Sequence, residues 1–151
     1  MGFLLGRSKP IYVGQSKKML EGYLASVSNF ESFESHGETI GVREVQRDLR
    51  FLIDEFCMRK DEELRSTVHN YAAIISTNYG GQGTMEDGYN SILSLHFQTQ
   101  EMKVRYAKIP KIRDAVVRLS LAALQSYNKS PYFEQIMARV QEEARRQLGE
   151  Q

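Results

Sequence analysis

The chain has 151 residues, of which 41% are apolar and 26% are charged, and its formal net charge is +1. This length is that of one domain with its own hydrophobic core, and the composition excludes a disordered or fibrous chain. No apolar run approaches the roughly 20 residues of a membrane-spanning helix, and the single cysteine, Cys57, excludes an internal disulfide. We therefore expect a folded protein of the cytoplasm.

The N-terminal segment differs from the rest of the chain. Residues 1–15 lack helical periodicity and contain three glycines and a proline, so we expect a flexible arm. The remainder, residues 16–149, is predicted to form a single helical domain. At the tip of the arm stand three apolar residues, Phe3, Leu4 and Leu5. Exposed apolar side chains are typical of interaction surfaces, so these three are candidate contacts for a protein partner.

Apolar residues at helical spacing predict two helices early in the domain. Ser16 can cap the first, which we expect to end near residues 35–37. Over residues 42–56 the apolar positions recur at alternating steps of three and four, and Glu55 stands four residues before Arg59. This spacing predicts an amphipathic helix that carries an exposed ion pair.

The charged run 59–63 separates this helix from a second apolar stripe, which begins at Leu64 with a displaced phase. Either one helix bends here or two helices meet, in which case Asp61 can cap the second. We favour a continuous or nearly continuous element that reaches about Ser76.

A glycine-rich loop follows, because three glycines within four residues disfavour a helix by about 1 kcal/mol each. Its predicted flexible residues are Gly80, Gly81, Gln82 and Gly83. The string Gly80-Gly81-Gln82 resembles the G-G-Q loop of class-1 peptide release factors in these three residues, which implies a glutamine backbone that reaches a peptidyl-tRNA ester. A phosphate cradle ahead of the next helix is a further interpretation. The following acids, Glu86 and Asp87, would repel phosphates and favour a plain flexible loop.

Residues 84–109 permit two interpretations. Thr84 followed by Asp87 resembles a capping box, and a stripe in one helical register runs from residue 92 to residue 109, for a helix that ends before Pro110. Apolar and polar residues also alternate over about 92–107, as in a β-hairpin, which would make the fold α+β. The hairpin needs a turn at residues 99–101, where there is no glycine, proline or asparagine. We therefore favour the helix.

The last third of the chain predicts two more helices. Pro110 suits the first turn of a helix that is apolar around most of its circumference, which is typical of a central helix. Ser130 and Pro131 are the predicted cap and first residue of the final helix, which ends at Gly149. The predicted fold is an all-α bundle of about five helices.

Two stretches are strongly basic. Residues 7–18 carry four bases and no acid, and residues 103–118 carry six bases against Asp114. Tyr106 lies within the second stretch, and a tyrosine among cations is typical of surfaces that bind single-stranded nucleic acid. Alternatively, Tyr106 belongs to the core and the bases form the solvated reverse face. The candidate polyanion-binding residues are Lys103, Arg105, Lys108, Lys111 and Arg113.

The residues that could carry catalysis or bind metal are scattered. The three histidines lie far from one another and from Cys57, without the spacing of zinc ligands. No nucleophile stands in a recognisable catalytic motif. We therefore expect neither a metal nor another cofactor, and we favour a non-enzymatic role over an enzyme.

These features predict a non-enzymatic interaction or assembly protein that acts through protein–protein contacts, as an oligomer or as a subunit of a larger complex. The alternative is a small helical subunit, such as a viral or phage structural protein, that binds nucleic acid or an acidic membrane surface. Its contacts would be the basic stretches 7–18 and 103–118.

Overall fold

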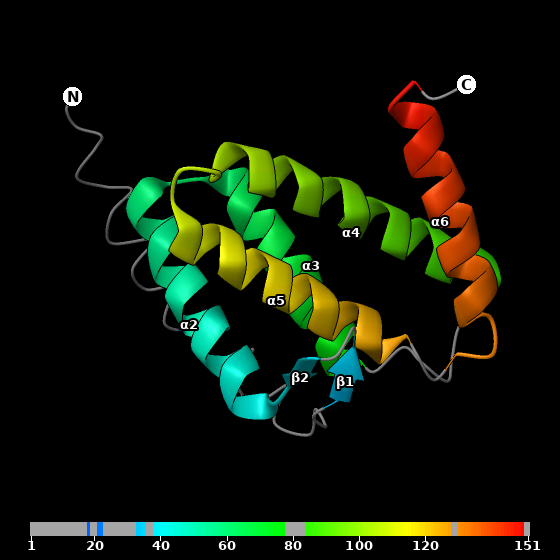
Figure 1. Cartoon of the computed structure of the whole chain (residues 1–151). Helices are drawn as coiled ribbons and strands as arrows, with labels where there is room; N and C mark the ends of the chain where they lie inside the picture. Colours follow the sequence, from blue (N-terminus) through cyan, green and yellow to red (C-terminus); the bar gives the residue numbers. More distant parts are fainter. Residues whose placement is uncertain are drawn as a thin grey trace.

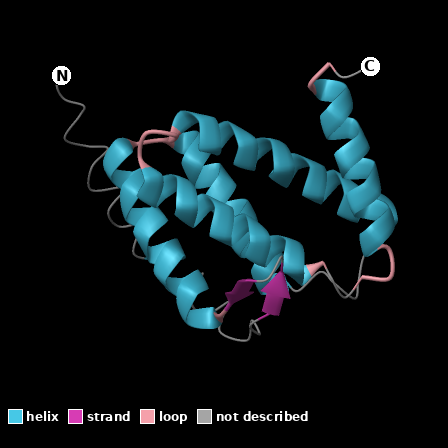
Figure 2. Cartoon of the chain, in the orientation of Figure 1, coloured by secondary structure: helices cyan, strands magenta, loops and turns pink. Residues whose placement is uncertain are grey.

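The computed structural model describes Lys18, Glu21–Gly22 and residues 33–35, 38–77, 84–127 and 130–149. Within these ranges it contains a helical bundle and one short antiparallel strand pair (Figures 1 and 2). The elements are β1 (Phe33–Ser35), β2 (Glu38–Ile40), α2 (Val42–Arg59), α3 (Glu62–Thr77), α4 (Met85–Arg105), α5 (Pro110–Ser126) and α6 (Phe133–Gln147). The predicted all-α bundle is confirmed.

Helix α2 forms where the clearest apolar stripe predicts it. The Glu44 carboxylate accepts a hydrogen bond from the Gly41 amide at 3.1 Å, which satisfies one backbone donor at the helix start. The stripe is buried, from Val45 at its beginning to Phe56 near its end. Arg59 donates to Glu55 at 2.9 Å, which confirms the predicted ion pair.

Two helices, rather than one bent helix, meet after α2. Lys60 adopts a left-handed conformation with φ of 55°, and this ends α2. The Asp61 carboxylate then accepts hydrogen bonds from the backbone amides of Glu63 and Leu64, each at 3.1 Å. Asp61 therefore caps α3, as the two-helix alternative predicts. The favoured continuous element is instead two helices, because the left-handed Lys60 separates them.

The ambiguous segment is a single helix, α4. Thr84 accepts a hydrogen bond from the Asp87 amide at 3.1 Å, as the predicted cap requires. The hairpin alternative at 92–107 is wrong, because the stripe that includes Ile92, Leu95 and Met102 faces the core in one helical register. The helix ends at Arg105, four residues earlier than predicted.

Helix α5 is the centre of the bundle. It packs against α2, α3 and α4 (Figure 1). Pro110 occupies its first turn, where a missing amide hydrogen costs little. Its fully buried residues face several directions, as expected of a helix surrounded by others: Ile112, Ala115, Val116, Leu119, Ala122 and Ala123.

Helix α6 packs mainly on α4, at the end of the bundle where α4 begins (Figure 1). It starts at Phe133, two residues later than predicted, because Ser130 accepts a hydrogen bond from the Tyr132 amide and residues 130–132 form a turn. Gly149 has φ of 80° and follows the helix end, as predicted.

The short strand pair was not predicted from the sequence. Phe33 pairs with Ile40 and Ser35 with Glu38, and β1 contacts α5. The buried Ile40 side chain anchors this pair to the core. Of the predicted first helix, Lys18, Glu21 and Gly22 are described and are helical, but its predicted end near residues 35–37 is wrong, because Phe33–Ser35 form strand β1. Its other residues, together with the arm at 1–15, lie outside the described residues.

Candidate functional site

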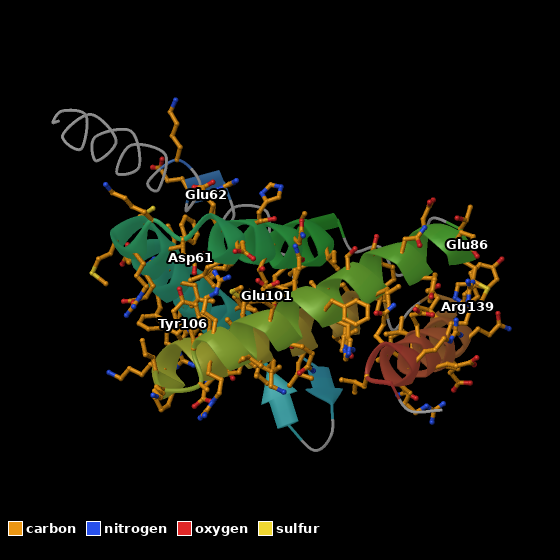
Figure 3. The ribbon with its side chains drawn as sticks, turned by 90° about the horizontal axis from the view of Figure 1, so that it is seen from above. Asp61, Glu62, Glu86, Glu101, Tyr106 and Arg139 are labelled. Atoms are coloured by element: carbon orange, nitrogen blue, oxygen red, sulfur yellow. The ribbon has the colours of Figure 1, made fainter. Side chains whose placement is uncertain are left out.

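A polar cluster joins the α2–α3 junction to the end of α4. The Arg105 guanidinium donates two hydrogen bonds to Asp61, at 2.8 and 2.9 Å. It also donates to Glu63 at 2.8 Å and to Glu101 at 3.1 Å. The Tyr106 hydroxyl donates a short hydrogen bond to Asp61. Figure 3 shows Asp61, Glu101 and Tyr106 gathered at one end of the molecule.

The titration behaviour of this cluster follows from its contacts. Partial burial opposes ionisation of Asp61, but hydrogen bonds from Tyr106 and Arg105 hold the pKa of its carboxyl below the usual value. Burial and the bond to Asp61 raise the pKa of Tyr106 to about 12. The pKa of Arg105 is raised further, first by Glu63 and then by Asp61. All three groups therefore keep their usual charge states at neutral pH, which suits a structural cross-link.

A second polar contact lies between α2 and α5. Arg118 donates to the Asp48 carboxylate at 2.8 and 3.0 Å, and the Asp48 side chain is 3% exposed. This pair forms the inner wall of a shallow groove with a volume of about 370 Å³. The groove rim carries two further bases, Arg47 and Lys111, and one acid, Asp114. The rim is therefore more basic than acidic.

The five predicted polyanion-binding residues lie on different surfaces. Lys108 and Lys111 are exposed beside the start of α5, whereas Arg105 is held by three carboxylates. Arg113 pairs with Asp114 at 3.2 Å, and Lys103 lines a cleft on the α4 side of the bundle. The other two predicted groups, Phe3–Leu5 and Gly80–Gly83, lie outside the described residues.

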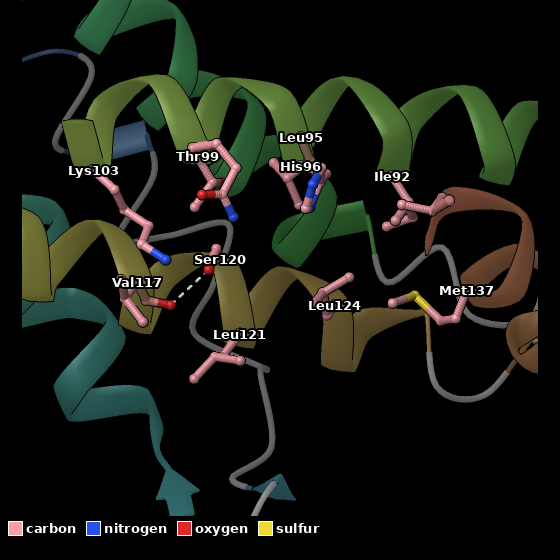
Figure 4. Close-up of a pocket in the computed structure, with 12 residues that line it drawn as sticks. Ile92, Leu95, His96, Thr99, Lys103, Val117, Ser120, Leu121, Leu124 and Met137 are labelled. Carbon is pink, nitrogen blue, oxygen red and sulfur yellow. Dashed lines mark hydrogen bonds between the residues drawn. The ribbon is translucent and has the colours of Figure 1, made fainter. Parts of the chain in front are cut away.

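A cleft with mainly apolar lining lies between α4, α5 and α6, with a volume of about 230 Å³. Figure 4 shows Ile92, His96 and Lys103 lining it from α4, Leu121 from α5, and Met137 from α6. Two hydroxyls at its wall are already hydrogen-bonded, because Ser120 donates to the Val117 carbonyl at 2.7 Å and Thr99 pairs with Tyr71. Its interior therefore offers mainly apolar surface.

The contact between α4 and α6 depends on a glycine. A Cβ added at Gly88 would stand 2.6 Å from the Ile136 Cδ1, so α6 approaches α4 closely at this point. Arg139 of α6 donates to Glu86 at 2.7 Å, and its guanidinium stands 3.9 Å from the centre of the Tyr89 ring. Figure 3 shows Glu86 and Arg139 at the opposite end of the molecule from Asp61.

The far half of α6 is more exposed than its first half. Along its apolar stripe Ile136 and Val140 are buried, Ala144 is half-buried, and Leu148 just beyond the helix is 77% exposed. These residues recur at steps of four, so they follow one face of the helix. Helix α4 covers the beginning of that face and leaves its end open to solvent.

Every buried side-chain nitrogen and oxygen of the described residues has a hydrogen-bond partner. The described residues include no group of three or more His, Cys, Asp or Glu side chains that could hold a metal ion. Nor does any helix within the described ranges combine the length and apolarity needed to cross a membrane.

Comparisons of the chain with models of known protein families, with curated proteins and with solved structures give no match.

Sequence reasoning missed three residues that shape these surfaces. Asp48 stands within the apolar stripe of α2, and a carboxylate at a core position is a sequence signal for a buried partner. Arg47 of α2 lines the same groove as Lys111 of α5. The spacing of residues within one helix does not show that two helices share a groove. Gly88 is a glycine within a helix, which signals a close approach by a neighbouring element.

Proposed function

We propose that this chain is a non-enzymatic assembly protein that self-associates through the apolar stripe of α6. The observation that carries the proposal is the exposure of this stripe beyond α4, where Ala144 is half-buried and Leu148 is exposed. An apolar stripe that is open at one end of a projecting helix is typical of helix–helix association.

The charges on α6 favour a second copy of the same helix as the occupant. It carries three acids and three bases, so two copies meet without a large excess of either sign. These residues are Glu134, Arg139, Glu142, Glu143, Arg145 and Arg146. The helix presents a neutral, amphipathic face to its neighbour.

The use of polar residues inside the bundle also supports an interaction role over catalysis. Asp61 and Arg105, and likewise Asp48 and Arg118, engage each other between helices. Groups that already neutralise one another are poor acids, bases or nucleophiles. Among the described residues, the exposed apolar side chains do not join helices of the bundle in the way that these ion pairs do.

Multi-angle light scattering over a range of protein concentrations tests the proposal. We expect a mass above that of one 17.4 kDa chain that rises with concentration. The double variant Ala144→Glu with Leu148→Glu places two charges on the stripe and should return the mass to that of one chain. The matched control is Gln135→Glu with Ala138→Glu, at exposed positions off the stripe, and it should associate as the parent does. A parent that remains monomeric at every concentration contradicts the proposal.

A second candidate function is binding of a polyanion, and the groove between α2 and α5 favours it. Arg47 and Lys111 stand at its rim, and Lys108 is exposed just before α5. Arg43 and Arg50 are exposed on α2 at a helical spacing from Arg47, so they extend the same basic side of the helix. Such a surface suits a phosphate backbone or an acidic membrane.

A further inference from the structure

The cleft between α4, α5 and α6 has the size and the lining of a ligand site. Ligand binding there does not depend on self-association through α6. Its volume of about 230 Å³ exceeds the roughly 150 Å³ at which an apolar cavity is known to bind a benzene-sized molecule. A methylene group is similar in size to a water molecule, which takes up about 30 Å³ in the liquid, so this volume corresponds to roughly eight methylene groups. The cleft is therefore large enough for a medium-length hydrocarbon chain.

The lining is ordered along α4, with apolar residues at one end and a cation at the other. Ile92, Thr99 and Lys103 recur at helical steps along one side of α4, over about 16 Å of helix. Leu121, Leu124 and Met137 close the opposite wall. Figure 4 shows the Lys103 amino group pointing toward α5, at the end of the cleft away from Met137.

The positive charge of Lys103 at this end of the cleft favours a ligand with a negative charge. Lys103 forms no ion pair with any carboxylate in the parts of the chain that the structure describes. His96, the other titratable residue that lines the cleft, is partly buried, and its burial and the positive charge of Lys103 lower the pKa of its imidazole. Lys103 is thus the single cation of the cleft at neutral pH, and it suits a head group with one negative charge.

We propose that this cleft binds a linear medium-chain carboxylate of about eight carbons, with the carboxylate on Lys103 and the hydrocarbon chain among Leu95, Leu124 and Met137. Burial of the hydrocarbon chain against the walls of the cleft contributes affinity, and the positive charge of Lys103 favours a negatively charged head group. Because there is one cation, a head group with a single charge fits better than a phosphate with two.

The test uses the full chain and four probes: octanoate, butanoate, octylammonium and octanol, each titrated by isothermal calorimetry. Octanoate should bind most tightly, and butanoate at least tenfold more weakly, since each buried methylene contributes about a fourfold change in affinity. Octylammonium should bind at least tenfold more weakly than octanoate, and octanol should lie between them. Equal binding of the two oppositely charged probes would overturn the proposal.

Charge reversal provides the matched variants. Lys103→Glu should weaken octanoate at least tenfold and strengthen octylammonium over its binding to the parent. Lys108→Glu makes the same charge change at an exposed lysine that does not line the cleft, and it should leave both affinities unchanged. Both positions are solvent-accessible, so both variants should fold, which circular dichroism verifies. If Lys103→Glu binds octanoate as the parent does, the ligand does not use this site.

The location of binding is read from methionine methyl resonances. Met137 lines the cleft, whereas Met58 is 67% exposed on α2 and does not line it. Octanoate should shift the Met137 methyl signal and leave that of Met58 in place. A shift at Met58 with none at Met137, or no binding of octanoate at millimolar concentration, refutes the assignment. Light scattering on the same samples reports self-association separately, so either proposal can fail without the other.

Discussion

The carboxylate of Asp48 on α2 and the guanidinium of Arg118 on α5 meet in a two-point contact, with hydrogen bonds of 2.8 and 3.0 Å. The carboxylate is buried, whereas the arginine remains about one-third exposed at 36%. The pair therefore joins a buried position of α2 to a partly exposed position of α5. Mutation of Asp48 and mutation of Arg118 should change the stability of the fold differently.

Removing the arginine alone leaves a buried charge without its main partner. We expect Arg118→Met to lower the free energy of unfolding by about 3 kcal/mol, at the lower end of the range for buried pairs because the guanidinium is partly solvated. The nitrogen of Arg47 nearest to Asp48 is 3.9 Å away and compensates little. Urea denaturation measures the loss. The double variant Asp48→Leu with Arg118→Met should recover at least half of it, and a double variant as unstable as the sum of both single variants would contradict this account.

The polar cluster at the α2–α3 junction predicts a pH dependence. Asp61→Asn keeps the cap of α3 but loses the negative charge that holds Arg105, so we expect a loss of about 1–2 kcal/mol at neutral pH. The pKa of Asp61 in the folded chain lies below its ordinary value of 3.8. Its contribution is therefore complete above that value and is lost as the pH falls through the lower, folded-state pKa.

Urea denaturation between pH 7 and pH 2 checks this expectation. The stability difference between the parent and Asp61→Asn should be constant down to about pH 5 and should then shrink. Asp54→Asn, at an exposed position on α2, is the control and should differ little from the parent at any pH. A difference that stays constant to pH 2 would show that the charge of Asp61 does not act as described.

The close approach of α4 and α6 predicts a specific coupling between two positions. Gly88→Ala adds a methyl group that meets the Ile136 Cδ1, and Ile136→Val removes that same carbon. Alone, Ile136→Val should cost about 1 kcal/mol. In a chain that already carries Gly88→Ala, Ile136→Val should lower the free energy of unfolding by at least about 0.5 kcal/mol less than it does in the parent. The reason is that the methyl group that Gly88→Ala adds fills the space that the Ile136 Cδ1 leaves. Thermal denaturation gives the four free energies. Ser94→Ala, at an exposed position on α4, should show additive behaviour with Ile136→Val.

The basic groove predicts salt-dependent binding. Neutralising Arg47, Lys108 and Lys111 with glutamine should weaken binding of single-stranded DNA and reduce the slope of log affinity against log salt by up to about 2. Fluorescence anisotropy over several salt concentrations measures both. The control removes three bases elsewhere, Arg65, Arg145 and Arg146, and should change the slope less. An unchanged slope in the first variant would count against polyanion binding in this groove.

Removal of residues 1–14 tests the predicted arm. A segment without periodicity adds little to a core, so the melting temperature should change by no more than a few degrees. The apolar tip at Phe3–Leu5 should contribute to association, and the assembly mass should fall in light scattering. Unfolding of the truncated chain would instead place the arm in the core.

The periodicity of apolar residues predicted most of the described helices, because each helix carries an apolar stripe on the face that it buries. Asp61, Thr84 and Pro110 marked helix starts correctly, since caps and prolines act within a few residues of their own position. Ser130 and Pro131 misled by two residues, because the same residue types also form turns. The strand pair at 33–40 was missed because three-residue strands are too short to show alternation.

The surfaces were less predictable than the elements. A run of bases along the chain suggested one polyanion site, yet Arg105 neutralises acids from α3 and α4 while Lys103 faces a cleft. Local charge counts do not reveal which carboxylates a helix will meet across the bundle. Equally, the cleft depends on three helices that come together from distant parts of the chain, so no single motif encodes it.

The shallow attachment of α6 separates the molecule into parts of unequal local stability. This helix has two buried residues, Ile136 and Val140, whereas α5 has eight. A segment with so little burial opens without the rest of the molecule, and its free energy of opening lies below that of global unfolding. Amide hydrogens of α6 should therefore exchange with solvent first and those of α5 last. Any partner or ligand that holds α6 against the bundle would be recognised by slower exchange in this one helix.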